Sequence, residues 1–179
     1  HPCDARSIEG AIAARERGLI VPTFIGPRAK IEAAALASGV SLEGVEIVDA
    51  PHSHAAADQA VELVRRGRLH ALMKGALHTD ELMTAVVRDG AGLRTERRIS
   101  HVFVIDAPSY PKLLLVTDAA INIAPTLDIK RDIVRNAVDL AHAIGIERPK
   151  VALLSAVETV EGKIPSTIEA AALCKMADR

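Results

Sequence analysis

The chain has 179 residues, enough for one domain with its own core or for one and a half domains. Its net charge of -1 excludes the broad basic field of nucleic-acid-binding proteins, so any anion binding depends on a few placed residues. Hydrophobic residues make up 49% but aromatic residues only 2%, so Ala, Val, Leu and Ile must build the core. Such a core suits helices packed closely on a parallel sheet.

Cys3 and Cys174 are the only cysteines, and they lie far apart in the sequence. Two such thiols make neither a disulfide framework nor a metal site, and a reducing cytosol fits them best. A metal set of His52, His54 and Asp58 is less favoured than a polar loop followed by a surface helix. No apolar run approaches the roughly 18 residues of a membrane span. We therefore expect a cytoplasmic protein without a metal centre.

The first part of the chain alternates between short apolar runs and amphipathic segments. Capping residues predict helices that begin near Asp4, Pro27 and Ser53, and a fourth that Thr79 caps. Apolar runs predict strands over residues 19–25, 45–48 and 69–73. Three strand–helix units in succession imply a parallel sheet with helices on its faces.

The pattern changes after about residue 98. Apolar runs over residues 99–105 and 113–116 are joined by a short turn, which predicts an antiparallel pair. A long amphipathic helix ending at Gly145, a buried strand over 150–155 and a helix opened by a Ser166–Glu169 capping box follow.

The last three of these elements cannot bury their own faces. We therefore expect a first α/β domain over residues 1–118, whose start is missing, and the beginning of a second over residues 119–179, whose remainder is missing.

The first candidate site lies at the end of the third predicted strand. Lys74 and Gly75 follow this strand, and Thr79 opens the next helix. Ligands of open α/β sheets bind in this crevice, where glycine allows close approach, lysine supplies charge and a helix N-terminus offers free N–H groups. An ordinary strand-to-helix loop with a solvated lysine explains the same residues equally well.

The second candidate is the arginine cluster before the antiparallel pair. Arg94, Arg97 and Arg98 fall within five residues. Guanidinium groups so placed can clamp phosphate, although a solvated charge run is the commoner explanation. Ser100 and His101 follow at once, and two polar side chains at the start of an apolar strand favour the functional interpretation.

The third candidate is the loop that leaves the second antiparallel strand, from Thr117 to Pro125. Thr117, Asp118 and Asn122 can bond loop backbone, and the alanines between them leave space for a ligand. Turn chemistry explains Asp118 well, but it explains less well why Asn122 lies between two isoleucines.

Together these stretches resemble the phosphate acetyltransferase and phosphate butyryltransferase family. The similarity runs almost end to end, and its most specific part is Thr117-Asp-Ala-Ala-Ile-Asn-Ile-Ala-Pro125. Met73-Lys-Gly75, Gly92-Leu-Arg-Thr95 and Ser100-His101 carry further likeness. Leu-Arg-Thr and Asn-Ile-Ala-Pro are more similar to the butyryltransferases. Residues 78–83 and 172–178 resemble members fused behind an enoyl-CoA hydratase domain.

The resemblance implies a two-domain, three-layer α/β/α fold related to the isocitrate and isopropylmalate dehydrogenases, with the active site between the domains. The implied reaction interconverts acyl-CoA and phosphate with acyl phosphate and CoA. It requires no cofactor beyond CoA as a substrate, and CoA and phosphate are the expected small-molecule partners. The resemblance also implies a homodimer and a possible hydratase domain upstream, with neither nucleic acid nor membrane as a partner.

Site residues are carried over by the same resemblance. Ser100, Asp118 and Asn122 are expected near the reacting groups. Substrate binding is expected of Lys74, Gly75, Thr79, Arg97, Arg98, His101, Thr117 and Pro125. The family's Ser-Arg-Ala-Asp-type segment, which is proposed to supply the thiol base, is absent from these 179 residues. The sequence therefore names no general base, and we expect this stretch alone to be inactive.

Two other functions remain open at this stage. One is a metal- and NAD(P)-dependent decarboxylating dehydrogenase of the same fold, although no aspartate cluster for the metal is visible. The other is a non-catalytic module that binds CoA without turnover.

Overall fold

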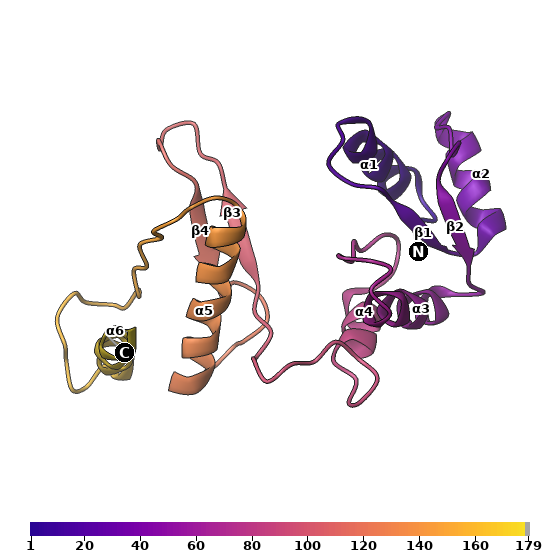
Figure 1. Ribbon diagram of the computed structural model, residues 1–179. Helices are drawn as coiled ribbons and strands as arrows, with labels where there is room; N and C mark the ends of the chain where they lie inside the picture. The colour runs from indigo at the N-terminus through magenta and orange to yellow at the C-terminus, as the bar shows by residue number, and fades with distance from the viewer. Residues whose placement is uncertain (178–179) are drawn as a thin grey trace. The chain divides into compact units, whose positions relative to one another are not determined.

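The structure, a computed structural model, describes residues 1–177 (Figure 1). These residues form two compact units, His1–Arg94 and a second that begins at Thr95. The expected domain boundary after residue 118 stays a prediction, and the last two residues of the expected second domain lie outside the described part. Each unit mixes helices with a two-stranded sheet, so the α/β class is confirmed.

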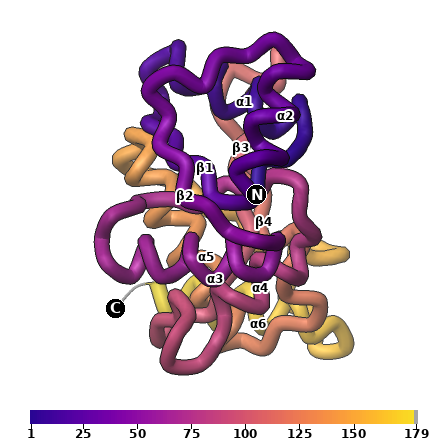
Figure 2. The backbone as a smooth tube through the Cα atoms, turned by 90° about the vertical axis from the view of Figure 1, so that its right-hand side faces the viewer, coloured from indigo at the N-terminus to yellow at the C-terminus, as the bar shows by residue number. Residues whose placement is uncertain are grey.

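The first unit contains four helices and two strands among its described residues. They are α1 (Ala5–Glu16), β1 (Thr23–Gly26), α2 (Arg28–Ser38), β2 (Glu46–Asp49), α3 (Ser53–Arg65) and α4 (Thr79–Val86). β1 and β2 pair in parallel with Phe24 opposite Ile47, and they lie side by side in Figure 2. This pairing confirms the expected parallel arrangement for the first two strands.

Local signals set the ends of these helices. Asp4 caps α1, because its Oδ1 accepts a hydrogen bond of 2.8 Å from the backbone N–H of Ser7. Gly39 ends α2 in the left-handed conformation, with a φ of 69°. The predicted caps of two other helices were wrong by one residue. His52 and His78, and not Ser53 and Thr79, occupy the N-cap positions of α3 and α4.

Small aliphatic residues build the core of the first unit, as the composition predicts. Ile8, Ile12, Phe24 and Ile31 are buried between α1, α2 and β1. A second cluster joins β1 to α3, and a third joins α3 to α4 and to Leu93.

The third predicted strand does not form. Residues 69–73 have no strand partner, although Leu69 and Leu72 still pack against the clusters around α3. A strand requires a neighbour that accepts its backbone hydrogen bonds, and none of the described strands pairs with this segment. Just beyond it, the N–H of Ala76 donates to the carbonyl of His1 over 2.9 Å.

The second unit consists of a hairpin and two helices among its described residues. They are β3 (Val102–Ile105), β4 (Leu114–Thr117), α5 (Leu127–Ala143) and α6 (Pro165–Ala177). The strands are antiparallel with Val102 opposite Thr117, which confirms the predicted pair. α5 packs against β4 and contacts α6.

Two predictions for the second unit were wrong. Residues 150–155 form no strand and pair with none of the described strands, and Val151 and Leu154 are 51% and 91% exposed. The capping box is also absent, since α6 begins at Pro165 and Glu169 forms an ion pair with Lys130 of α5. Over residues 1–177, no helix has the length and apolar character that a bilayer span needs.

Candidate functional site

Asp118 organises the loop that follows β4. Its Oδ1 accepts hydrogen bonds of 3.2 Å from the backbone N–H groups of His101, Ala120 and Ile121. Its Oδ2 accepts from the backbone N–H of Asn122 over 3.0 Å and from the Asn122 side-chain amide. Five donors from two segments therefore converge on one carboxylate.

These bonds determine the charge state of Asp118. Burial acts to raise the pKa of its carboxyl group, but the bonds from the Asn122 side chain and from three backbone N–H groups outweigh burial. The pKa falls to about 2, from 3.8. Asp118 is therefore ionised at neutral pH, and a carboxylate of this kind is a poor proton acceptor.

Asn122 links this loop to the arginine cluster. Its Oδ1 accepts a bond of 3.0 Å from Nε of Arg98, and its Nδ2 donates to the carbonyl of Ile99 over 2.9 Å. The structure therefore brings together Arg98, Asp118 and Asn122, which the sequence singled out in two separate motifs.

Asn136 of α5 is a central residue of this site that the sequence analysis missed. Its Nδ2 donates to the carbonyl of Arg98 and to Oγ of Ser100, both over 2.9 Å. Its Oδ1 accepts from Arg97 over 3.3 Å, and Arg97 also forms an ion pair with Asp139. The side-chain amide of Asn136 therefore bonds to Arg97, Arg98 and Ser100 at the same time.

A helical pattern in the sequence could have revealed Asn136. Asp132, Asn136 and Asp139 are spaced by four and three residues, which places them on one face of α5. All three bind the arginine segment, since Asp132 accepts from the backbone N–H of Arg98 over 3.0 Å. This row of polar residues on one face of the helix could have pointed to Asn136 before the structure was known.

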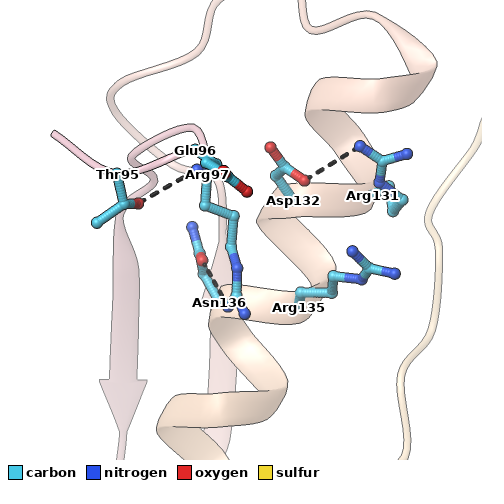
Figure 3. Close-up of a pocket in the computed structure, with 7 residues that line it drawn as sticks. All are labelled: Thr95, Glu96, Arg97, Arg131, Asp132, Arg135 and Asn136. Carbon is cyan, nitrogen blue, oxygen red and sulfur yellow. Dashed lines mark hydrogen bonds and ion pairs between the residues drawn. The ribbon is translucent and has the colours of Figure 1, made fainter.

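An open depression of about 690 Å³ lies between the arginine segment and α5 (Figure 3). Its lining residues are Thr95, Glu96, Arg97, Arg131, Asp132, Arg135 and Asn136. Arg131 contacts Asp128 and Asp132, and its buried Nε has no hydrogen-bond partner within the described residues. Arg135 forms no salt bridge with any residue that the structure describes. Guanidinium groups with open donors suit a phosphate-like anion.

The other predicted residues of this unit lie around the same hydrogen-bond network. The Thr117 hydroxyl donates to the carbonyl of His101 over 2.7 Å. The His101 ring meets Phe103 edge to face with centroids 4.4 Å apart, and its buried Nδ1 has no partner in the described part of the chain. Pro125 directly precedes the N-cap residue of α5 and takes part in none of these bonds.

Lys74, Gly75 and Thr79 belong to the first unit. Nζ of Lys74 donates to the carbonyl of Leu77 over 2.8 Å, so this exposed lysine braces its own loop. A Cβ atom at Gly75 would lie 2.8 Å from the carbonyl oxygen of His1, which explains the glycine. Thr79 is the first residue of α4 and is exposed. A shared cleft between these residues and Asn122 would span both units and stays a prediction.

Comparison with known proteins adds a family likeness. A family described as "Phosphate acetyl/butaryl transferase" matches residues 54–179. A phosphate acetyltransferase of Rhizobium meliloti is 62% identical over 179 residues, covering 100% of this chain and 57% of the relative. A phosphate butyryltransferase of Clostridium acetobutylicum is 42% identical over 176 residues, covering 98% of this chain and 58% of the relative.

A solved structure gives the same likeness. The crystal structure of a branched-chain phosphotransacylase from Enterococcus faecalis V583 has a TM-score of 0.77 and 29% sequence identity. The match covers 95% of this chain and 59% of that protein. The chain therefore spans somewhat more than half the length of the relatives described above.

Proposed function

Because the chain belongs to the phosphate acetyl/butyryl transferase family, we propose that the full-length protein interconverts acyl-CoA and phosphate with acyl phosphate and CoA. A phosphate oxygen attacks the thioester carbonyl carbon, a C–O bond forms and the C–S bond breaks. The CoA thiolate leaves and takes a proton. The reverse direction begins with loss of that proton. Coenzyme A is a substrate here, and the proposal includes no resident cofactor.

The cationic depression on α5 is the observation that carries this proposal for the described residues. Phosphate is a compact anion, and the lining of the depression has three arginines, Arg97, Arg131 and Arg135, against the two carboxylates of Glu96 and Asp132. Arg135 forms no salt bridge with a described residue, although its charge helps to lower the pKa values of Asp132 and Asp139, so its N–H donors can bind phosphate without breaking a salt bridge. Held in this way, the phosphate loses little further entropy when it attacks.

Ser100 is proposed to act on the acyl carbonyl. Its Oγ accepts from Asn136, which leaves the hydroxyl proton to donate to the oxygen that becomes negative during attack. Asn122 is proposed to hold Arg98 near the substrates. Asp118 is proposed as a positioning residue and not as a base, because its pKa of about 2 makes it a weak proton acceptor.

The finer expectations belong to the same proposal. Lys74, Gly75 and Thr79 are proposed to bind an anionic part of CoA, with the site between two domains of a fold related to the isocitrate dehydrogenases. The full-length protein is also proposed to be a homodimer in the cytoplasm, with a hydratase domain upstream in the same chain. Relatives named as phosphate acyltransferases give no support to the dehydrogenase alternative.

The direct test uses purified full-length protein with acyl-CoA and phosphate, and it measures release of the CoA thiol. Phosphate-dependent release supports the proposal. Reduction of a nicotinamide cofactor without thiol release would instead indicate a dehydrogenase, and stoichiometric CoA binding without turnover would indicate a binding module.

Arg135→Ala tests the depression itself. We expect the KM for phosphate to rise about 10-fold or more, as lost charge-assisted hydrogen bonds of about 1.5–3 kcal/mol would require. Arg148→Ala is the matched control, since Arg148 is exposed and lies outside the depression. Equal phosphate KM values for both variants would place phosphate elsewhere.

A further inference from the structure

His1 and Cys3 form a pair of reactive side chains in the first unit. Sγ of Cys3 lies 3.6 Å from Nε2 of His1, within hydrogen-bond distance for sulfur. Nδ1 of His1 lies 2.7 Å from the carbonyl oxygen of Ala76. Because a carbonyl oxygen only accepts, a neutral ring carries its proton on Nδ1, and Nε2 can take the proton of the Cys3 thiol. A thiol, a base and a group that orients the base form the arrangement of an activated nucleophile.

The protein packs closely around His1. A Cβ atom at Gly26, the last residue of β1, would lie 3.3 Å from Cα and 3.4 Å from Cδ2 of His1. On the other side, the carbonyl oxygen of His1 accepts from the N–H of Ala76 over 2.9 Å. His1, marked N in Figure 1, is therefore fixed between the end of β1 and the 74–77 loop. The pair lies at the carboxyl end of a parallel strand, where ligands of open α/β sheets bind.

The Cys3 thiol needs a base to react at neutral pH. Burial raises the pKa of this thiol, the charge of Lys30 in α2 acts to lower it, and that of Asp4 acts to raise it. Cys3 is therefore a thiol and not a thiolate at pH 7, and only the thiolate is a strong nucleophile. His1 is the base within reach, and Cys3 is partly exposed, so a small reagent can approach its sulfur.

We propose that Cys3 is a modification site for small-molecule disulfides and that His1 activates it. His1 accepts the thiol proton, and the Cys3 sulfur attacks one sulfur of the disulfide. A new S–S bond forms at Cys3, the S–S bond of the reagent breaks, and the released thiolate takes the proton from His1. Cys3 is oxidised and the released half of the reagent is reduced to a thiol, so the disulfide is the oxidant. Excess thiol reverses the reaction.

The modification acts on the 74–77 loop through His1. A disulfide at Cys3 removes the S–H donor from Nε2 and adds a bulky group beside the ring. The same histidine bonds to Ala76 through both its ring and its carbonyl, and Lys74 and Gly75 come just before Ala76. Lys74 and Gly75 are proposed above to bind an anionic part of CoA. This second step rests on the proposed function, and it predicts a higher KM for CoA in the modified protein.

The test incubates the full-length protein at pH 7 with glutathione disulfide or CoA disulfide and follows the mass added at each cysteine. Cys174 is the internal control, because it is exposed on α6 and bonds to no histidine of the described residues. Without a base, the raised pKa of Cys3 would make it the slower of the two thiols. We expect Cys3 to be the faster. A faster reaction with CoA disulfide identifies CoA as the preferred source, and equal rates identify small disulfides in general.

His1→Asn removes the base but keeps an N–H donor for the Ala76 carbonyl. We expect this variant to slow the reaction at Cys3 by about 100-fold or more at pH 7, as the loss of a general base implies, and to leave Cys174 unchanged. Above the ordinary thiol pKa of 9.0, Cys3 ionises increasingly without help, so the difference between the two proteins should shrink as the pH rises. A purely structural role of His1 would give a difference that does not depend on pH.

A Cys3 that reacts more slowly than Cys174 in the unmodified protein overturns the inference without any variant. Equal rates at Cys3 in the unmodified protein and in a folded His1→Asn variant overturn it as well. An unchanged KM for CoA in the modified, active protein overturns the link to the loop. Modification is measured by mass and needs no turnover, so absence of phosphate-dependent thiol release refutes the proposed function while the reactivity of Cys3 is still tested.

Discussion

Replacing Asp118 by Asn tests whether one carboxylate holds the candidate site together. The variant keeps one carbonyl oxygen but replaces the other acceptor oxygen with an NH₂ group. This NH₂ group would then face the N–H donors of Asn122, which in the unmodified protein donate to Oδ2 of Asp118. A pKa lowered from 3.8 to about 2 corresponds to about 2 kcal/mol of stabilisation at neutral pH. We expect the loop to lose about this amount.

Hydrogen exchange measures this loss where it occurs. The backbone N–H groups of Ala120, Ile121 and Asn122 bond directly to Asp118, and about 2 kcal/mol corresponds to roughly 30-fold faster exchange after correction for intrinsic rates. Asp106→Asn is the matched control, because Asp106 is an exposed residue of the hairpin. We expect exchange in the control to match that of the unmodified protein.

The pH dependence has a definite sign. The folded-state pKa lies below the unfolded value, so the stabilisation is fully present above pH 4 and is lost as the pH falls towards about 2. The difference between the unmodified protein and Asp118→Asn should therefore shrink across that window. Exchange that is equal in the two proteins at pH 7, or a difference that stays constant from pH 5 to pH 2, would refute the reasoning.

Two further substitutions test packing and positioning. A Cβ atom at Gly92 would lie 2.4 Å from the carbonyl oxygen of Val86 and 2.6 Å from that of Arg88, so Gly92→Ala should destabilise the protein by about 1–3 kcal/mol in urea unfolding. Gly162→Ala meets nothing within 4 Å and should change little; equal losses would contradict this account. Asn136→Ala removes the amide that holds Arg97, Arg98 and Ser100, so we expect a higher phosphate KM and a lower kcat, whereas a purely structural role would lower only the melting temperature.

The helices were predictable because their signals are local. Asp4 and Gly39 mark the ends of α1 and α2 through bonds to residues a few positions away. The spacing of apolar residues also identified α5, in which Ile133 and Ala141 are buried. The predicted caps of α3 and α4 were wrong by one residue, since neighbouring polar residues such as His52 and Ser53 compete for the same position.

The strands were less predictable. Residues 45–48 and 113–116 agree with β2 and β4 within one residue at each end, because each has a partner within the described chain. Residues 69–73 and 150–155 are also rich in apolar residues, yet no described strand pairs with them. Apolar character favours a strand, but hydrogen bonds to a neighbour make one.

The sequence by itself determined the family likeness, the helices and the short-range bonds of Asp118 to its own loop, because those depend on residues close together in the chain. Only the tertiary structure decided that Arg98 meets Asn122 and that Asn136 joins Arg97, Arg98 and Ser100. Those partners lie more than twenty residues apart in sequence, and the docking of α5 against the hairpin brings them together. Side chains of ordinary type become a site when packing fixes their distances, which no local pattern specifies.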